Sequence, residues 1–405
     1  MSNVLNLISE RIGGCDFEKK SAYKMELIKE AKRQFLLNNN LEILDFGIGE
    51  PDLMPPENVT QELNIQTKKY ENRGYADNGS EKFKRAAATF MQKTFQVEID
   101  PDTECVHCIG AKSALSILPK CFINPGDFVA VTVPGYPIFQ THTEYLGGKI
   151  VKIPLLRENN FLPDLNAIDP KLLEKIKVFS INYPNNPTSA EANLAFFTQL
   201  VDLAKKYNFL IINDAAYSAV TTNSPCSILQ VPDSKSVAIE VHSMSKAYNM
   251  TGWRLGWVCG NKTAVNAFAK VKDNSDSGQF LAIQHACSVA LEDINFPKKM
   301  AQRYNLRRKI FSDVIQNKGL RIFHSNSGFF VYIQSPKRVK FYDTTIEFSS
   351  ARECQDWLLK TLGILCIDWD DVEPAIRFSM TFHAENDVIF IDKLSQRLEN
   401  CTFEY

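Results

Sequence analysis

The stretch VAIEVHSMSKAYNMTGWRLG, which runs from Val237 to Gly256, decides the fold. It opens with apolar residues interrupted only by Glu240, and then places hydroxyl side chains and Lys246 directly after this run. Similar short apolar runs lie earlier in the chain, at Phe128–Val133, Val178–Ile181 and Phe209–Ile212. Apolar side chains at consecutive positions are typical of strands that are buried on both faces of a parallel sheet.

Helix-like segments alternate with these strands. The segment Glu191–Tyr207 places its apolar side chains on one face, at Leu194, Phe197, Leu200, Val201 and Ala204. The alternation extends from about Leu41 to Gln284 and predicts a doubly wound α/β domain. In such domains ligands bind at the carboxyl ends of the strands.

The two ends of the chain have a different pattern. Apolar residues recur every four positions in Ser21–Leu37, which predicts an amphipathic helix. After about Pro297 a long charged helix is expected at Lys298–Gln316, followed by strand-like and helix-like pieces. This region predicts a second, smaller α+β domain.

Composition narrows the class of protein. The 405 residues are 44% hydrophobic and 23% charged, which argues against disorder. Lys and Arg number 46 against 47 Asp and Glu, without a polybasic stripe, so no nucleic-acid partner is expected.

No apolar run approaches the roughly 18 residues of a membrane helix. Charges at Glu10 and Arg11 argue against a signal peptide and favour a cytoplasmic location.

Ten cysteines are scattered along the chain, unlike the dense pattern of a small disulfide scaffold. One Cys-x-x-Cys occurs, Cys105 to Cys108, but no second pair at matching spacing accompanies it. The six histidines show no ligand spacing either. We therefore expect no metal site, and we interpret His242 as a buried histidine with satisfied hydrogen bonds.

The lysine after the strand is the first candidate for chemistry. Ser243 and Ser245 flank the approach to Lys246, and Arg254 follows eight positions later. Two hydroxyls and a guanidinium suit a phosphate group, whose oxygens accept several directed hydrogen bonds. A lysine beside them could form a Schiff base with a carbonyl compound.

Polar residues follow the other strands as well. Asp214 could pair with a cationic ring nitrogen, while Tyr217 and Asn186 could donate hydrogen bonds to an oxyanion. Gly110-Ala111-Lys112 opens an apolar helix, and a helix N-terminus with a cation is a phosphate site. The aromatic ring of Tyr136 could stack on a flat ligand ring. Each also has an ordinary explanation: a helix cap for Asp214, a turn for Asn186 and core packing for Tyr136.

Pyridoxal 5'-phosphate (PLP) is one molecule that needs all of these groups. In their order along the chain, from about Asp45 to Arg377, the motifs resemble the class I/II aminotransferases of PLP fold type I. The resemblance implies a large domain with a mostly parallel seven-stranded sheet, at residues 49–297. It also implies a smaller domain formed by residues 298–405 and by the N-terminal segment 1–48.

The same resemblance implies the roles of the residues at the strand ends. Lys246 would form the Schiff base and transfer the substrate proton in ping-pong transamination, and Asp214 would pair with the pyridinium nitrogen. Asn186 and Tyr217 would contact the phenolic oxygen, and Tyr136 would stack on the ring. The phosphate would be held by Ser243, Ser245, Arg254, Gly110, Ala111 and Lys112.

The substrate side follows from the same family pattern. Arg377 matches the arginine that binds the substrate α-carboxylate, although a structural ion pair is the alternative. Ile48 and Gly49 lie in a glycine turn expected at the substrate, which Asn186 would also contact. Tyr75 resembles a tyrosine that reaches the partner subunit's phosphate. We therefore expect a homodimer with shared active sites, acting on amino acids and 2-oxo acids.

A narrower resemblance concerns the substrate. Asp214-Ala215-Ala216-Tyr217-Ser218, the form Gly110-Ala111-Lys112 and the run before Lys246 are similar to LL-diaminopimelate aminotransferases. This likeness implies LL-diaminopimelate as amino donor and 2-oxoglutarate as acceptor, in lysine and peptidoglycan precursor synthesis. A general aspartate, alanine or aromatic aminotransferase stays open, as do a PLP-dependent β-lyase or decarboxylase and a PLP-binding regulator.

Two features depart from the pattern of that narrower family. Ser189 stands where the family usually has glycine, so the backbone of that loop could differ. Four carboxylates, Asp368, Asp370, Asp371 and Glu373, lie shortly before Arg377. They could bind the distal ammonium group of a diamino substrate or simply form a solvated acidic loop.

Overall fold

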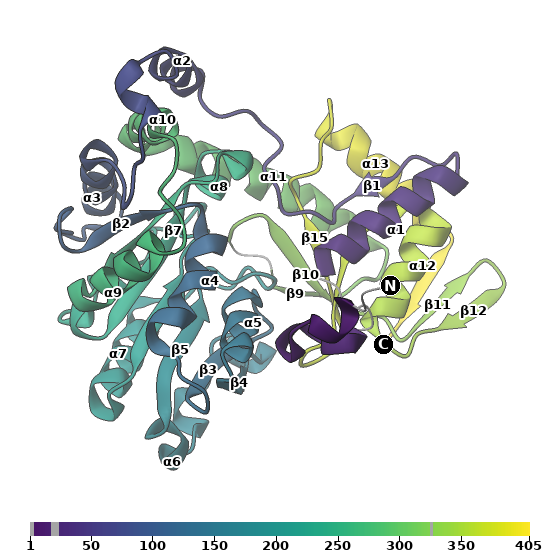
Figure 1. The fold of residues 1–405 in the computed structure, drawn as a ribbon. Helices are drawn as coiled ribbons and strands as arrows, with labels where there is room; N and C mark the ends of the chain where they lie inside the picture. The colour runs from purple at the N-terminus through teal and green to yellow at the C-terminus, as the bar shows by residue number, and fades with distance from the viewer. Residues whose placement is uncertain (1–3, 18–23, 325–326) are drawn as a thin grey trace. The chain divides into compact units, whose positions relative to one another are not determined.

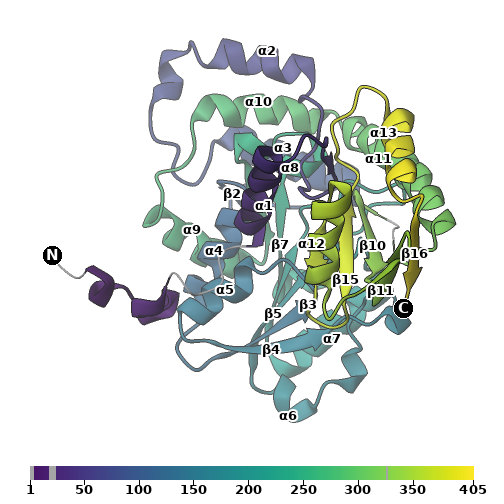
Figure 2. The same cartoon turned by 90° about the vertical axis from the view of Figure 1, so that its right-hand side faces the viewer.

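The structure is a computed structural model that describes residues 4–17, 24–324 and 327–405. The chain divides into two compact units. One consists of Glu50–Lys309 and Phe323–Val331, and the other of Met1–Gly49, Ile310–Ile322 and Tyr332–Tyr405. Figures 1 and 2 show the ribbon from two directions. Among the described residues, no helix has both the length and the apolar character needed to cross a bilayer.

The first unit is built on a seven-stranded sheet with the order β2-β8-β7-β6-β5-β3-β4. Only β8 runs antiparallel to its neighbours, β2 and β7; the remaining pairs are parallel. The strands are β2 (Cys105–Cys108), β3 (Phe128–Val133), β4 (Lys149–Pro154), β5 (Ile176–Asn182), β6 (Leu210–Asp214), β7 (Ala238–Ser243) and β8 (Gly256–Gly260). The predicted α/β class and mostly parallel sheet are confirmed.

Helices surround this sheet (Figure 1). They are α2 (Glu57–Gln66), α3 (Glu81–Phe95), α4 (Ala111–Phe122), α5 (Ile138–Tyr145), α6 (Pro170–Leu173), α7 (Leu194–Tyr207), α8 (Met244–Ala247), α9 (Lys262–Asp273), α10 (Leu281–Glu292) and α11 (Asn295–Asn317), whose last turns belong to the second unit. α4 packs against α5 and α9, whereas α7 packs against β6 and the 3-10 helix η7 (Ile228–Gln230).

The second unit contains smaller sheets and, among the described residues, three further α-helices; parts of two of the strands, Phe323–His324 and Phe330–Val331, fall in the first unit. A four-stranded sheet has the order β14-β15-β10-β9, a three-stranded sheet the order β12-β11-β16, and β1 pairs with β13. The strands are β1 (Leu44–Asp45), β9 (Ile322–His324), β10 (Phe330–Gln334), β11 (Arg338–Phe341), β12 (Thr344–Glu347), β13 (Ile364–Leu365), β14 (Ile367–Trp369), β15 (Ala375–Ser379) and β16 (Cys401–Glu404). The helices are α1 (Lys24–Asn38), α12 (Ala351–Leu362) and α13 (Asp387–Arg397). Phe46 centres its core, with ring contacts to Phe311, Phe378, Phe382 and Phe390.

The helix boundaries show where local signals decide the start and the end. α7 begins at Leu194 rather than at Glu191, because the side chain of Asn193 accepts a hydrogen bond from the Phe196 N–H and caps the helix. It ends at Asn208, which adopts the left-handed conformation of a helix terminus. The predicted helix Ser21–Leu37 corresponds to α1, and its first three residues lie outside the described ranges.

Candidate active site

Neighbouring parallel strands bring the predicted site residues to one edge of the seven-stranded sheet. Asn182 at the end of β5 pairs in register with Asp214 at the end of β6, and β7 lies beside β6. β7 ends at Ser243, and α8, which carries Lys246, begins at the next residue. Because parallel strands end at the same edge, the loop of Asn186 also starts there.

Lys246 lies against an aromatic surface. Its Nζ is 6.0 Å from the ring centroid of Tyr217 and 5.9 Å from that of Phe329. The Tyr217 ring also contacts Phe329 and Phe330, at centroid distances of 5.5 and 5.6 Å. The lysine side chain is half-buried, so apolar ring surface covers part of it while solvent still reaches it.

Asp214 is a buried carboxylate with few donors. Its side-chain Oδ1 accepts one hydrogen bond, from the Ala216 N–H at 3.3 Å. Burial raises the pKa of Asp214 to about 6, although the Ala216 N–H and the Lys246 ammonium oppose this effect. A carboxylate in this position gains stability from a cationic partner, and a protonated ring nitrogen is one.

Asn182 connects the loops that carry Asp214 and Asn186. Its Nδ2 donates to the Asp214 carbonyl at 2.8 Å, and its Oδ1 accepts from the Asn186 N–H at 2.9 Å. The next asparagine, Asn185, accepts hydrogen bonds from the Thr188 N–H and hydroxyl. No pattern in the sequence indicated this role of Asn182, because its partners lie on a different strand and in the following loop.

A group of hydrogen-bond donors surrounds the start of α8. The Ser243 hydroxyl caps this helix by accepting from the Ser245 N–H, and the Ser245 hydroxyl accepts from Arg254 Nη1 at 3.5 Å. Arg254 has a positive φ of 57°, and its carbonyl accepts from the Gln279 side chain at 2.8 Å. Gln279, which the sequence did not indicate, therefore holds the arginine backbone in this turn.

The N-terminus of α4 lies beside the guanidinium of Arg254. Gly110 caps α4 with a φ of 77°, and a Cβ built there would lie 2.5 Å from Arg254 Nη2. Position 110 therefore favours glycine because of its backbone conformation, and a larger residue would also require the Arg254 guanidinium to shift. Ala111 is the first, buried residue of α4, and the exposed Lys112 follows. Tyr136 is half-buried in the loop after β3.

Tyr75 lies in a firmly held loop and is itself 84% exposed. The buried Lys272 donates through its Nζ to the Asp77 carbonyl at 2.6 Å. The N–H groups of Ala76 and Asp77 both donate to the Ser277 carbonyl. A large aromatic side chain is thus presented to solvent by an ordered backbone.

Arg377 belongs to the second unit. It lies on β15, is 2% exposed, and donates through Nη2 to the Gly47 carbonyl at 2.6 Å. The Thr381 hydroxyl donates to the Ile48 carbonyl at 2.9 Å. The predicted glycine turn that includes Ile48 and Gly49 therefore lies directly beside the predicted carboxylate-binding arginine.

Two of the four carboxylates before Arg377 have local partners. Asp368 is buried and forms an ion pair with Lys24, with an Oδ2–Nζ distance of 3.2 Å. Asp370 accepts hydrogen bonds from the N–H groups of Ala351 and Arg352, at the start of α12. These contacts give both residues a structural explanation.

Cys105 and Cys108 occupy β2, where both are buried and free. Burial raises the pKa of the Cys105 thiol to about 12, so it remains protonated near neutral pH. Within the described parts of the chain, no three His, Cys, Asp or Glu residues gather to form a metal site.

Comparison with known proteins shows to which family the chain belongs. The family model described as aminotransferase class I and II matches residues 42–394. The chain belongs to this family. Among its curated relatives, the LL-diaminopimelate aminotransferase of Methanocaldococcus jannaschii is 39% identical, over 100% of this chain and 99% of that protein. That of Methanococcus maripaludis is 42% identical, over 95% of this chain and 93% of that protein.

Solved structures agree with this aminotransferase assignment. Substrate-bound BacF from Bacillus subtilis superimposes with a TM-score of 0.88 at 28% identity, covering 98% of this chain and 99% of that chain. An aminotransferase from Staphylococcus aureus gives a TM-score of 0.82 at 28% identity, covering 89% of this chain and 94% of that chain. This aminotransferase is therefore PLP-dependent, and its fold is PLP fold type I, as its sequence motifs predicted.

The residues of this aminotransferase fit the cofactor. The buried carboxylate of Asp214 accepts few hydrogen bonds, which suits a cationic ring nitrogen. The side chains of Ser245 and Arg254 lie beside the N-terminus of α4 at Gly110, and this combination of donors suits a phosphate. Lys246 lies in α8, which directly follows the neighbouring strand β7.

Proposed function

We propose that this aminotransferase transfers an amino group from LL-diaminopimelate to 2-oxoglutarate. The observation that carries the substrate proposal is the 39–42% identity, over at least nine-tenths of the chain, to relatives named LL-diaminopimelate aminotransferase. The solved structures of BacF and of the Staphylococcus aureus aminotransferase, which have other names, are 28% identical. We also propose that the enzyme acts in the cytoplasm.

PLP, when bound, supplies an aldehyde for the amino group and an electron sink for the Cα carbanion. We propose that Asp214 keeps the ring nitrogen protonated. The raised pKa of Asp214 supports this role, because a buried acid with few donors gains most from a nearby cation. Asn182 supports it indirectly by fixing the Asp214 backbone.

Lys246 is the proposed base. It would remove the proton from the substrate Cα and deliver it to C4′ of the cofactor. Proton transfer by a positioned base contributes typically ~10²–10⁴-fold to the rate. The rings of Tyr217 and Phe329 beside its Nζ restrict where the amine can move. Tyr217 and Asn186 would donate to the phenolic oxygen, and Tyr136 would lie against the ring.

The phosphate is assigned to Ser243, Ser245, Arg254 and the Gly110-Ala111-Lys112 turn. The contact between Arg254 and the Gly110 turn supports this proposal, because it brings a guanidinium to a helix N-terminus. Tyr75 would reach the phosphate of the partner subunit in a homodimer. Its exposure on an ordered loop is consistent with a side chain that is covered only on assembly.

The substrate α-carboxylate is assigned to Arg377, assisted by Ile48, Gly49 and Asn186. A buried guanidinium that already binds the glycine turn is oriented for a planar carboxylate. We propose that residues 49–297 act as the PLP-binding domain. Residues 1–48 and 298–405 would form the smaller domain.

An amino-donor panel tests the proposal. LL-diaminopimelate, meso-diaminopimelate, aspartate, alanine and phenylalanine would each be incubated with 2-oxoglutarate, and glutamate formation would be measured. We expect LL-diaminopimelate to give the highest kcat/KM. A higher value for another donor would contradict the substrate proposal, and release of pyruvate and ammonia from cysteine would indicate a β-lyase instead.

A further inference from the structure

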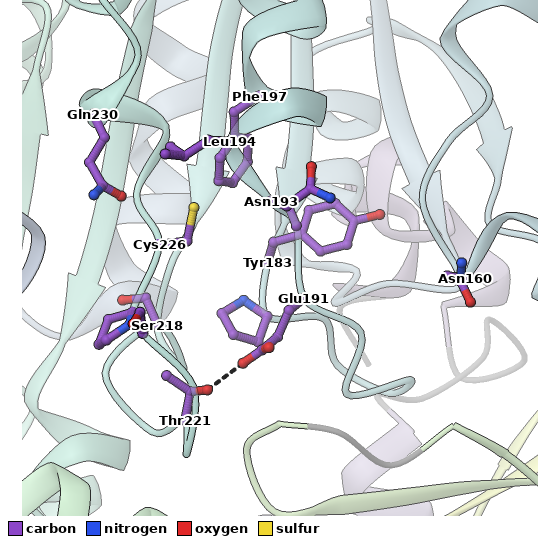
Figure 3. A pocket seen from close by; sticks show the side chains of 14 residues that line it. Asn160, Tyr183, Glu191, Asn193, Leu194, Phe197, Ser218, Thr221, Cys226 and Gln230 are labelled. Atoms are coloured by element: carbon purple, nitrogen blue, oxygen red, sulfur yellow. Dashed lines mark hydrogen bonds between the residues drawn. The ribbon is translucent and has the colours of Figure 1, made fainter.

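A cavity of about 460 Å³ opens in the first unit (Figure 3). Its walls come from the loops after β5 and β6, from the start of α7 and from η7. None of the described residues that line it is Lys246, Asp214 or Asn186. Its volume lies in the range of small-molecule sites, about 300–1,000 Å³.

The cavity has an apolar wall and a polar end. Tyr183, Phe197 and Leu194 contribute ring and alkyl surface. The Tyr183 hydroxyl donates to the Phe161 carbonyl at 2.7 Å, so its ring is held in place. Figure 3 shows Glu191 projecting at the other end, bonded to the Thr221 hydroxyl. Such a combination of apolar surface and few polar groups is typical of ligand sites.

Glu191 is the only charged side chain among the described residues that line this cavity. Its carboxylate accepts from the Thr221 hydroxyl and, at 2.7 Å, from Asn223 Nδ2. A carboxylate has about four lone-pair positions, so these bonds leave acceptor capacity for a ligand. A cation with N–H donors uses that capacity best.

A second carboxylate lies behind the wall. Glu240 is fully buried and accepts from Ser227, Asn213 and the Ile228 N–H. Burial would raise its pKa, but bonds from His242, Ser227 and Asn213 bring the pKa of Glu240 below its usual value, so it stays ionised.

Both carboxylates act on a thiol in the lining of the cavity. Cys226 lines it, and the pKa of the Cys226 thiol is raised to about 12 by burial and by the charges of Glu240 and Glu191. Arg308 opposes them from outside the lining: it is 3% exposed, and Glu191 favours its charged form.

We propose that this cavity is a second small-molecule site, specific for small alkylammonium compounds. The ammonium group would lie on Glu191, and the alkyl part would lie along Leu194 and Pro225, because Tyr183 and Phe197 are each only 1% exposed and form the back of the wall. The proposal is independent of the substrate assigned above. Ser218, which lines the cavity, directly follows Tyr217, so an occupant would contact the loop that carries a predicted catalytic residue.

The probe is N,N-dimethylbutylammonium, a tertiary amine that cannot condense with the aldehyde of PLP. Calorimetric titration of the holoenzyme would compare it with butanol and butyrate, which share its alkyl chain but are neutral or anionic. We expect the ammonium probe to bind at least tenfold more tightly than butanol, and butyrate not to bind. Equal binding of the three probes, or no binding of any, would overturn the proposal.

Glu191→Gln removes the charge and keeps the shape. We expect it to weaken ammonium binding at least tenfold, whereas Glu292→Gln, on the exposed face of α10, should leave binding unchanged. Unaltered binding in Glu191→Gln would disprove the site. Because loss of Glu191 could destabilise the nearby Arg308, Ser224→Trp gives a second test: its ring would fill the cavity and abolish binding, and persistent binding would contradict the proposal.

Discussion

Two buried carboxylates on neighbouring strands behave in opposite ways. Asp214 at the end of β6 accepts one side-chain hydrogen bond from the backbone, and burial raises its pKa to about 6. Glu240 within β7 accepts from four groups, at Asn213, Ser227, Ile228 and His242, and its pKa falls despite burial. Burial alone therefore does not decide the direction of the pKa shift. The number of donors decides it, because a buried carboxylate with few donors is the one that a further cation would stabilise most.

The largest expected effect is on catalysis at Asp214. Asp214→Asn removes the negative charge that would keep the ring nitrogen protonated, so kcat should fall on the order of 10²–10³-fold. Steady-state transamination would measure it. Asp202→Asn, at an exposed position of α7, is the matched control and should retain full activity. A loss of less than tenfold in kcat for Asp214→Asn would show that the charge of Asp214 is not what keeps the ring nitrogen protonated.

The two acids should also give opposite pH dependences of stability. The folded apoprotein binds the Asp214 proton more tightly than the unfolded chain, so its free energy of unfolding should decrease as pH rises from about 4 to about 6. The change should reach about 3 kcal/mol. Urea unfolding of wild type and Asp214→Asn across this range would measure it, since the variant lacks this slope. The contribution of Glu240 has the reverse sign and is lost as pH falls below its usual pKa.

A smaller effect is expected from Glu240→Gln. The amide cannot accept from four donors, so the free energy of unfolding should fall by about 2 kcal/mol, while kcat changes only slightly. Thermal or urea unfolding, combined with kcat for the folded fraction, separates the two effects. Glu292→Gln serves as the exposed control. A large loss of kcat with normal stability would show that Glu240, too, acts in catalysis.

The smallest expected effect tests how much a single hydrogen-bond donor to Glu240 contributes to stability. Ser227→Ala removes one of the donors to Glu240, so we expect a loss of about 1 kcal/mol in unfolding free energy. Ser224→Ala, at an exposed position in the same loop region, should be neutral. Combining Ser227→Ala with Glu240→Gln should cost less than the sum of the two single changes, because they share one interaction.

The sequence located the strands and most of the site for a physical reason. Continuous apolar runs identify strands buried on both faces, and polar residues directly after them must lie at one sheet edge. Lys246, Asp214 and Asn186 were predicted this way and do follow strands that end together. Their contacts with the cofactor stay a prediction.

Other features depended on contacts between distant segments. Glu240 was read as an interruption of an apolar run, although donors from two other segments make it a stable buried charge. Asp52 forms buried ion pairs with Arg303 and Arg307, about 250 positions away, and no local pattern indicates such a pair.

Ser189 shows a third case. The family resemblance leads to the expectation of a glycine at this position, and Ser189 has a positive φ of 59°. Its hydroxyl donates to the Phe330 carbonyl at 3.0 Å, a bond that glycine could not make. The departure noted in the sequence therefore concerns the side chain, while the backbone retains the conformation that glycine favours.

The close approach of Arg254 to Gly110 has a consequence for engineering. A library that randomises position 110 should return glycine almost exclusively, since the positive φ of 77° strains any residue with a β-carbon, and the Arg254 guanidinium would also have to shift. A shorter residue at position 254 would relieve the side-chain contact and leave the backbone strain, so a search for altered cofactor selectivity should keep glycine at position 110 and vary the residues around it.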